Sequence, residues 1–498
     1  MIELKAAEIA LAHLFAPMHL AMFMLGLLLG LILGVLPGID ALFGLAVLLP
    51  FCLVIDATSA LPLILGMASI TFTSGPIPSI LIGAPGTAGS TATILDGHPM
   101  AKRGEAGKAM GAAFTASLIG GLIGCLVLTL SIPIFRPLVL MLGSPEFLCL
   151  CVLGLSLVSV LGGKYPLRGV VSAGMGIMLS QIGLDPILGM QRWTFGTLYL
   201  QNRISIVVFA LGFFALAEII DLSIKGTRIS AVHSSVGKWD GLRETLRHWK
   251  LTLQSALIGS FVGFLPGLGA GVACWIAYAW ALISCKPRSG FGKGDIRGVI
   301  APEASDNASV GGALIPTIAF GIPGGTLMAL MLSAFWMLGI KPGPDLMTKH
   351  LDLVYLMVWT MALSNIVGAI MCFLFTDLIA KIAMIRIGRL APIVIMLIFS
   401  GALVTNMELY DIVAVVLFCI LGLTMKHLDW PRPPMLLGYI LGPLIEKFYF
   451  SSQMIFGYKW MLRPGVIVVL ILTALCLYVG IRVQRKETEV QDAMEAES

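Results

Sequence analysis

The chain has 498 residues, of which 58% are hydrophobic and only 12% carry a charged side chain. Soluble domains carry about twice that share of charge, so the composition excludes an ordinary soluble protein and predicts an integral membrane protein. The net charge of +5 is modest, which does not favour nucleic-acid binding, and the absence of a GxxxxGK[ST] phosphate-binding loop disfavours an ATP-driven pump.

Two apolar segments of the first half are interrupted by Pro-Gly. The first, GLILGVLPG from Gly30 to Gly38, contains what we name an LPG break, and the second, IPSILIGAPG from Ile77 to Gly86, contains a PG break. Pro-Gly stops a helix because proline lacks an N–H and glycine adopts backbone angles that other residues avoid. The freed backbone groups need partners, so we expect all such breaks to face one shared interior site.

A polar stretch divides the chain. Residues 221–250 hold six Lys or Arg side chains, and the positive-inside rule predicts that this loop is cytoplasmic. The predicted organisation is therefore a first transmembrane repeat over residues 1–220, a cytoplasmic loop over 221–250, a second transmembrane repeat over 251–481 and a cytoplasmic tail over 482–498.

The second half repeats both breaks in the same order. GSFVGFLPG from Gly259 to Gly267 shares the pattern GxxxGxLPG with the first half, and IPTIAFGIPG from Ile315 to Gly324 matches its counterpart by identity or similarity at seven of ten positions. Gly and Pro are frequent in membrane helices, where GxxxG can simply let helices pack closely. Paired breaks in two halves instead favour one duplicated unit, which is typical of secondary transporters that bind substrate in mid-bilayer.

The charges of equivalent loops predict that the two repeats are inverted. The loop Asp96–Lys108 is basic, whereas its counterpart near Lys341–Lys349 is poorer in charge. Between the two breaks of each half the order reverses, because Lys286–Arg297 is basic and the link Asp56–Ser59 is not. We therefore predict an all-α polytopic membrane protein of two inverted-topology repeats, with broken helices and re-entrant hairpins.

The breaks also predict the chemistry of the site. Each restarted helix presents uncapped N–H groups and a positive dipole end, which suit a carboxylate, and the unwound carbonyls suit Na+. Small hydroxyl and amide side chains nearby can orient an anion without burying a full charge. The predicted substrate-binding residues are Ser79, Pro85, Gly86, Thr87, Asn307, Thr317, Pro323 and Gly324.

Acidic residues near the breaks are candidates for coupling transport to a cation. Asp40 is either the N-cap of a helix that starts near Ala41 or a titratable or cation-binding group. Glu303 raises the same question, since after Pro302 it can equally be an acid in the first turn of a helix. The predicted cation-coupling residues are Asp40, Gly38, Gly267, Glu303 and Asp306.

Several long stretches match one known family in order along nearly the whole chain. They are LPGIDALFGLAVLLP, SILIGAPGTAGSTATILDGHPMAKRGEAGKAMG, GFLPGLGAGVACWIAYA, FGKGDIRGVIAPEASDNASVGGALIPTIAFGIPGG and GIKPGPDLM. The stretch DGHPMAKRGEAGKA is far more specific than a short motif. On these residues the chain resembles the large permease subunit of the tripartite tricarboxylate transporters.

The resemblance implies cation-gradient-driven secondary active uptake of a tricarboxylate or related organic anion, and an elevator-like architecture. It also implies a small four-helix membrane subunit, a periplasmic solute-binding protein that delivers the substrate, and a multi-pass location in the bacterial inner membrane. No enzymatic activity and no cofactor are expected, and no metal beyond a transported Na+; the transported cation is Na+ or H+.

The family's two signature regions fall on the breaks and on the acidic stretch that precedes the second PG break. The matching positions are Gly34, Pro37, Gly38, Pro85, Gly86, Thr87, Pro266, Gly267, Gly269, Glu303, Asn307, Pro323 and Gly324. Four positions depart from the family pattern. Gly83-Ala84 replaces Asn-Thr, Asp306 stands where Asn is usual, and Asp40 replaces a small residue, so the family's usual substrate does not follow.

Two rival functions are weighed against transport. A channel also lines its pore with broken helices, and saturable, gradient-coupled uptake would separate a carrier from it. Residues Gly292–Asp295 read GKGD, which resembles the GxGD of intramembrane aspartyl proteases. Those enzymes need paired carboxylates, whereas Asp295 lies among basic residues that hold it ionised, so an enzyme is disfavoured.

Overall fold

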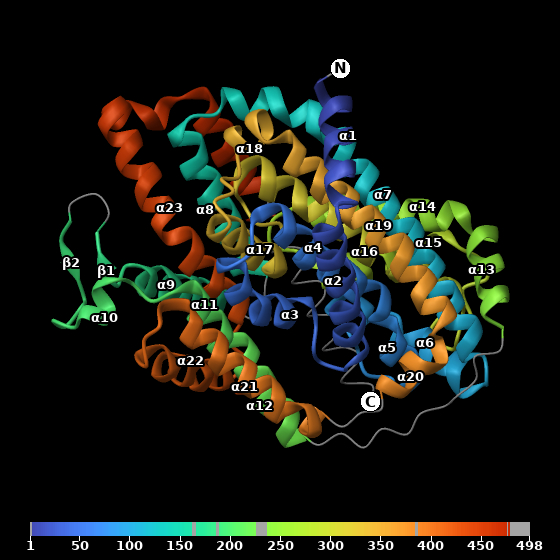
Figure 1. Cartoon of the computed structure of the whole chain (residues 1–498). Coiled ribbons are helices and arrows are strands. Elements are labelled where there is room, and N and C mark those ends of the chain that lie inside the picture. Colours follow the sequence, from blue (N-terminus) through green and yellow to red (C-terminus); the bar gives the residue numbers. More distant parts are fainter. Residues whose placement is uncertain are drawn as a thin grey trace.

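The computed structural model describes residues 2–161, 166–185, 189–225, 237–383, 387–475 and 477–478 (Figure 1). Part of the predicted central loop, residues 226–236, and the whole predicted tail, residues 482–498, lie outside this set. The elements before the central loop are α1 (Ile2–Leu14), α2 (Pro17–Val35), α3 (Ala41–Leu48), α4 (Ala57–Ser74), α5 (Pro76–Ile82), α6 (Ile94–Lys102), α7 (Ala106–Met141), α8 (Ser144–Leu161), α9 (Pro166–Ser180), β1 (Gly183–Leu184), β2 (Gln191–Arg192), α10 (Leu198–Gln201), α11 (Ile206–Ala210) and α12 (Ala217–Lys225).

The later elements are again helices. They are α13 (Lys238–Arg247), α14 (Trp249–Phe264), α15 (Gly269–Ser284), α16 (Arg297–Phe320), α17 (Thr326–Met337), α18 (Pro344–Lys349), α19 (Leu351–Leu374), α20 (Thr376–Ala383), α21 (Ile387–Asn406), α22 (Tyr410–His427) and α23 (Arg432–Phe456). Short 3₁₀ turns cover Leu49–Leu53 (η1), Ala88–Ser90 (η2) and Gly457–Leu462 (η4), and a π-helical turn covers Leu211–Leu216 (η3).

Six helical segments of the described chain are long and apolar enough to cross a membrane. They are Pro17–Val35, Ala57–Ile82, Ala106–Met141, Ile206–Ile224, Leu351–Leu374 and Tyr410–His427. A bent pair, Arg432–Leu462 and Pro464–Leu475, adds a seventh if it is one span. The only strands described are the antiparallel pair β1 and β2. The protein is therefore an all-α polytopic membrane protein, as the sequence predicts.

The GxxxG pattern before each LPG break packs a helix tightly on the segment that leads to the PG break of the same half. A Cβ on Gly30 in α2 would lie 2.2 Å from the carbonyl oxygen of Met67 in α4. A Cβ on Gly259 in α14 would likewise lie 2.2 Å from the carbonyl oxygen of Ser305 in α16. The next glycine of each pattern approaches the following turn of the same partner, so the two halves share this local packing.

The helix α19 joins two polar ends of the molecule. It begins at Leu351 directly after α18, and near its other end the carbonyl of Phe373 accepts a hydrogen bond from Lys238 Nζ at 3.1 Å. Lys238 opens α13, which packs on α7, the helix that follows the loop 96–108. A helix of 24 residues is about 36 Å long, so the segment 341–349 and the loop 96–108 lie at opposite ends of it. Inverted repeats require that these two equivalent segments lie at opposite ends. Which of the two ends is cytoplasmic stays a prediction.

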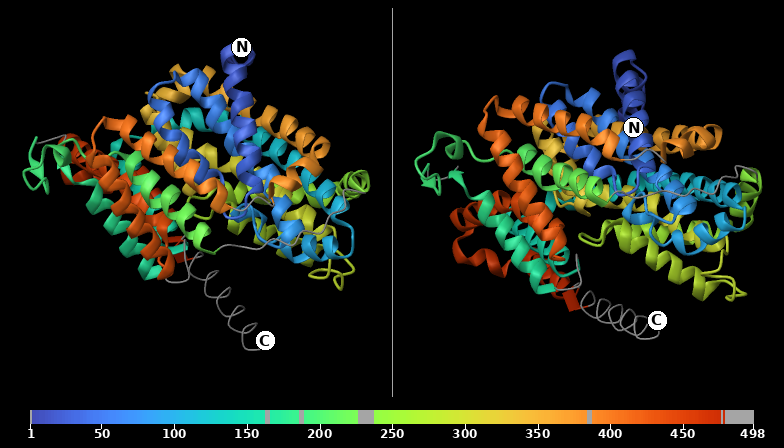
Figure 2. Two further views of the ribbon diagram at one scale, coloured as in Figure 1. Left: turned by 60° about the horizontal axis from the view of Figure 1, so that its bottom comes forward. Right: turned by 90° about the horizontal axis from the view of Figure 1, so that it is seen from below.

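A second group of helices lies beside the broken helices (Figure 2). In this group α23 packs on α8 and α9, and α22 packs on η3. The restarted helices α3 and α17 contact it, α3 through η3 and α17 through α23. The space between the breaks and this group holds the candidate site.

Candidate substrate cavity

A cavity of about 1270 Å³ lies where the four breaks meet. Gly38 and Gly267 of the LPG breaks line it, and so do Thr87 and Gly325, which directly follow the two PG breaks. Small-molecule pockets typically enclose roughly 300–1,000 Å³, so a polycarboxylate fits with room for solvent. The breaks are far apart in the sequence, and the fold brings them to one place.

The two halves hold their breaks together in the same way. Gly38 and Gly267 both have left-handed backbone angles, with φ of +78° and +94°. The N–H of Gly38 donates to the carbonyl of Pro85 at 3.3 Å, and the N–H of Gly267 donates to the carbonyl of Gly324 at 3.2 Å. Each LPG break is therefore hydrogen-bonded to the PG break of its own half, which satisfies part of the backbone that the breaks free.

The PG glycines are required by close backbone contacts. A Cβ on Gly86 would lie 2.4 Å from the carbonyl oxygen of Gly34, and a Cβ on Gly324 would lie 2.6 Å from the Cα of Ala313. Pro85, Gly86, Pro323 and Gly324 are not among the lining residues of the cavity. Within the described chain these four predicted residues shape the cavity rather than face it.

Two helices of the second half start at the cavity without a side-chain cap. The first-turn residues of α15 and α17, which begin at Gly269 and Thr326, line the cavity, and neither N-cap residue makes a side-chain cap hydrogen bond. In the first half α3 is capped, because Asp40 Oδ1 accepts the N–H groups of Leu42 at 3.0 Å and Phe43 at 3.2 Å. Of its two predicted alternatives, the structure places Asp40 as the N-cap, and it also lines the cavity. Among the described residues, no side-chain cap therefore covers the first-turn N–H groups and the positive dipole end at the starts of α15 and α17.

A chain of hydroxyl groups lies behind the first PG break. The backbone N–H of Thr87 donates to Ser90 Oγ at 3.2 Å, and Ser79 Oγ donates to the same oxygen at 2.9 Å. The hydroxyl of Thr87 donates to Asp306 Oδ2 at 3.4 Å. Thr87 lines the cavity, whereas Ser79 is fully buried and does not line it. Thr87 thus connects the cavity to Asp306 on α16, a helix that also lines the cavity directly through Ser309, Val310 and Ala313.

The acids Glu303 and Asp306 on α16 are both fully buried. Thr93 donates to Glu303 Oε1 at 2.5 Å, and Ser117 donates to Oε2 at 3.4 Å. Asp306 Oδ1 has no hydrogen-bond donor in the described part of the chain, and Gly89 is so close that a Cβ there would collide with this carboxylate. Asp306 therefore holds one unsatisfied oxygen directly behind the cavity wall.

The alternative that Glu303 is a first-turn acid is wrong. The helix α16 begins at Arg297, so Glu303 is its seventh residue. Pro302 does not start the helix but lies inside it. The carboxylate of Glu303 is directed to Thr93 and Ser117 instead of to the helix start.

Asn307 and Thr317 connect α16 to its surroundings. Asn307 Nδ2 donates to Thr73 Oγ1 on α4 and to Asn365 Oδ1 on α19, each at 3.0 Å. Thr317 Oγ1 accepts the N–H of Gly324 at 3.4 Å, which fastens the second PG break. Neither predicted residue lines the cavity.

Two charged residues that the sequence reasoning did not select also line the cavity. They are Glu218 and Arg432, and Arg432 Nη2 lies 3.0 Å from Glu218 Oε2. Lys426, which does not line the cavity, lies with its Nζ 2.6 Å from Glu218 Oε1. The sequence did hold a signal for Glu218, an acid inside the apolar segment Ile206–Ile224, where a charge is costly. Arg432 stands in WPRPP, between apolar segments, and nothing local distinguishes it from a loop residue.

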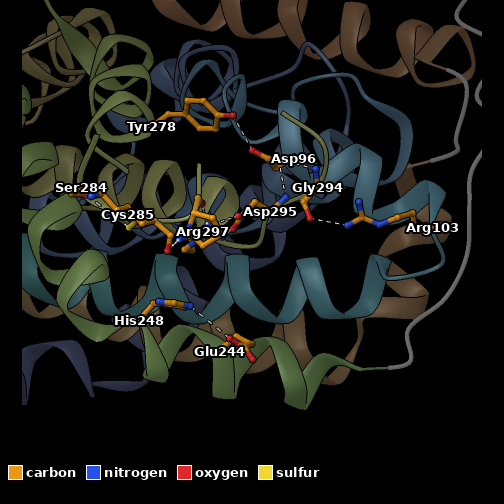
Figure 3. Close-up of polar contacts among 12 residues, drawn as sticks. Asp96, Arg103, Glu244, His248, Tyr278, Ser284, Cys285, Gly294, Asp295 and Arg297 are labelled. Atoms are coloured by element: carbon orange, nitrogen blue, oxygen red, sulfur yellow. Dashed lines mark hydrogen bonds and ion pairs between the residues drawn. The ribbon is translucent and has the colours of Figure 1, made fainter. Parts of the chain in front are cut away.

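Two polar stretches that are far apart in the sequence are joined outside the cavity (Figure 3). Asp96 Oδ1 accepts the backbone N–H groups of Gly294 and Asp295, each at 2.8 Å, and Asp96 Oδ2 accepts the hydroxyl of Tyr278 at 2.9 Å. Arg103 donates to the carbonyl of Gly294 at 2.7 Å. The first-half loop is thereby tied to the segment that enters α16.

Asp295, the acid of GKGD, is a salt-bridge partner. Its Oδ2 lies 2.6 Å from Nη2 of Arg297. Burial opposes ionisation, but hydrogen bonds from the side chain and backbone of Arg297 hold the pKa of Asp295 below its ordinary value. An aspartyl protease instead needs one carboxyl kept protonated beside another, so Asp295 lacks the chemistry of a catalytic acid.

Known proteins place the chain in a family. The profile of the tripartite tricarboxylate transporter TctA family matches residues 20–437. The chain is 31% identical over 432 residues to "Uncharacterized 52.8 kDa protein in TAR-I ttuC' 3'region" of Agrobacterium vitis, with 86% of each chain covered. It is 33% identical over 189 residues to "Uncharacterized protein in TAR-II ttuC' 3'region" of the same organism, covering 38% of this chain and 78% of that one. No solved structure matches. The chain therefore belongs to the tripartite tricarboxylate transporter TctA family, as a multi-pass membrane component of a transport system with several subunits and not an enzyme.

Proposed function

We propose that this chain is the permease of a cation-gradient-driven secondary transporter that takes up a tricarboxylate or related organic anion. The observation that carries the proposal is the cavity at which the four breaks meet, with the uncapped starts of α15 and α17 in its wall. Membership of the TctA family supplies the general function, transport.

The first half contains a model for how the anion binds. At α3 the carboxylate of Asp40 accepts two backbone N–H groups of the first turn. The equivalent start in the second half, α15, has Gly269 where the first half has Asp40, and within the described residues no N-cap side chain accepts its first-turn N–H groups. A substrate carboxylate can do at α15 or α17 what Asp40 does at α3, because a helix N-terminus favours negative charge.

Asp306 is the best candidate for the coupling group. Its unsatisfied oxygen would be neutralised by a proton or by Na+, and its other oxygen is bonded to Thr87, which lines the cavity. Since an unpaired buried carboxylate is costly, a cation at Asp306 would favour the arrangement of Thr87 that the substrate meets. The carbonyl groups near Gly38 and Gly267 remain further candidates for Na+ ligands.

The proposal includes the partners and the motion. A periplasmic solute-binding protein would deliver the substrate, and a small four-helix membrane subunit would complete the complex in the bacterial inner membrane; the family is tripartite, which supports both. The hydrogen bonds between the LPG and PG breaks of each half would let the breaks move together against the second group of helices, as an elevator requires.

The test is uptake into proteoliposomes that contain this chain and its small partner. A panel of labelled carboxylates is offered with and without the binding protein, under an imposed Na+ or H+ gradient. We expect saturable accumulation that follows one cation gradient and needs the binding protein. Unsaturable flux down the substrate gradient would indicate a channel, and failure of the whole panel with an intact complex would exclude carboxylates.

A further inference from the structure

We propose that Arg432 binds a carboxylate of the substrate and gives the cavity its preference for anions that carry more than one carboxylate. This inference rests on the proposed function, because it assumes that the cavity holds a carboxylate.

Arg432 supplies the positive charge in the lining of the cavity. Among the described residues that line it, Arg432 is the only one with a permanent positive charge, whereas Asp40 and Glu218 are the two acids. A polyvalent anion entering this cavity meets two like charges and one opposite charge. Because charge repulsion in a partly dry site is strong, binding such an anion needs the guanidinium.

The guanidinium is held in place but not saturated. Nη2 donates to Glu218 Oε2 at 3.0 Å, and the group lies over the ring of Phe214, with Cζ 5.4 Å from the ring centroid. Nη1 is buried and has no hydrogen-bond partner in the part of the chain that the structure describes. A guanidinium offers five N–H donors in a planar fork that matches a carboxylate, so donors remain for a second acceptor.

Glu218 does not depend on Arg432 alone. Lys426 Nζ lies 2.6 Å from its other oxygen, so Glu218 stays paired when Arg432 turns to another carboxylate. Lys426 also lies 2.6 Å from Asp221 Oδ2, which fixes the lysine between α12 and α22. Arg432 can thus exchange one partner for another without leaving a bare buried charge.

Together these groups define two anion positions in one cavity. One is at the starts of α15 and α17, and the other is at Arg432, the first residue of α23. A monocarboxylate needs only the position at the helix starts, whereas a di- or tricarboxylate also has a carboxylate for Arg432. Arg432 therefore selects for the second carboxylate.

The test compares four variants of the full chain in its complex: Arg432→Gln, Arg432→Lys, Glu218→Gln and the control Arg168→Gln. Arg168 is a matched control because it lies over the ring of Trp430, just before α23, donates to the carbonyl of Leu428 and does not line the cavity. Uptake kinetics are measured with labelled citrate, succinate and lactate, and complex assembly is checked by size-exclusion chromatography.

We expect Arg432→Gln to raise the KM of citrate and succinate roughly tenfold or more, with any lactate uptake unchanged, as loss of a charge-assisted hydrogen bond predicts. Arg432→Lys should restore part of the affinity, because it keeps the charge without the fork. Glu218→Gln should lower the KM, because it frees Arg432, and Arg168→Gln should match the wild type.

Two results overturn the inference. One is a wild-type KM for citrate and succinate in Arg432→Gln. The other is equal loss of every activity in both Arg432 variants with failed assembly, which assigns Arg432 to the packing of α23 alone. If instead the wild type takes up no carboxylate, the proposed function itself fails.

Discussion

Asp40 and Asp306 are two aspartates beside one cavity, and their neighbours give them different chemistry. Asp40 Oδ1 accepts two backbone N–H groups at the start of α3. Asp306 Oδ1 has no donor in the described structure, and Asp306 Oδ2 has only the long hydrogen bond from Thr87. The cap gives Asp40 a structural role, whereas the unsatisfied oxygen of Asp306 leaves a place where a proton or a cation could bind.

We therefore predict that Asp306→Asn uncouples transport. The amide cannot bind a proton or Na+ as a carboxylate can, so cation binding at this position would no longer be linked to substrate transport. Accumulation in proteoliposomes should fall to equilibrium with the external substrate, while exchange of labelled for unlabelled substrate continues. Gradient-dependent accumulation at the wild-type level in this variant would rule out Asp306 as the coupling group.

Asp40 gives a second prediction, because two substitutions separate its role as the N-cap of α3 from the role of its negative charge. Asparagine caps a helix about as well as aspartate, so Asp40→Asn should keep the wild-type thermal stability and pH dependence of uptake. Alanine cannot cap, so Asp40→Ala should lose about 1 kcal/mol of stability, measured as a lower Tm. Loss of pH dependence in Asp40→Asn would instead show that the charge of Asp40 takes part in coupling.

At the scale of elements, each half pairs a glycine-rich helix with the segment that leads to its PG break. The pairs are α2 on α4 and α14 on α16, and in both a glycine faces a backbone carbonyl. The same glycine pattern directly precedes the LPG break in each pair, so the close helix packing and the interruption of the helix lie next to each other in the sequence. Such packing holds each LPG break beside the segment that leads to the PG break of its own half.

This packing predicts a sharp difference between two glycine substitutions. Gly259→Ala would place a Cβ 2.2 Å from the carbonyl oxygen of Ser305, so α14 must move, at a cost of about 1–3 kcal/mol. Gly174→Ala in α9 meets no heavy atom within 4 Å and should leave stability unchanged or slightly raised. Thermal unfolding of the purified variants tests this, and equal Tm values would contradict the close contact.

At the scale of the whole molecule, three polar stretches gather at one end. The loop 96–108 is bonded to the segment 286–297 through Arg103 and the carbonyl of Gly294. The loop also packs on α13, where a Cβ on Gly241 would lie 2.1 Å from the carbonyl oxygen of Lys108. All three stretches are basic in the sequence, so their meeting agrees with the prediction that they share one face of the membrane.

The prediction for the whole molecule concerns membrane sidedness. Lys102, Lys286 and Lys341 are all exposed, and single cysteines can replace them in a background without the nine native cysteines. A membrane-impermeant maleimide should label positions 102 and 286 from the same face and position 341 from the opposite face. Labelling of all three from one face would contradict the inverted topology.

Much of the fold could be predicted from the sequence, because it follows from local patterns. Apolar segments predict membrane helices, Pro-Gly predicts where they stop, and Asp40 before Ala41 predicts a helix cap. The role of Glu303 was not predictable in this way. Whether Pro302 begins a helix or lies inside one depends on what precedes it, and here the salt-bridged turn at Asp295 and Arg297 starts α16 earlier.

The sequence by itself determined the class of the protein, the doubled breaks and the family, since each of these is written in composition, spacing or motif. Only the tertiary structure decided which residues face the cavity. Thr87 faces the cavity, whereas Ser79, which lies on the preceding short helix α5, is buried and does not line it. Glu218 and Arg432 line the cavity although they belong to distant segments of the chain. The physical reason is that lining a cavity depends on the packing of helices far apart in the chain, and no local pattern carries that information.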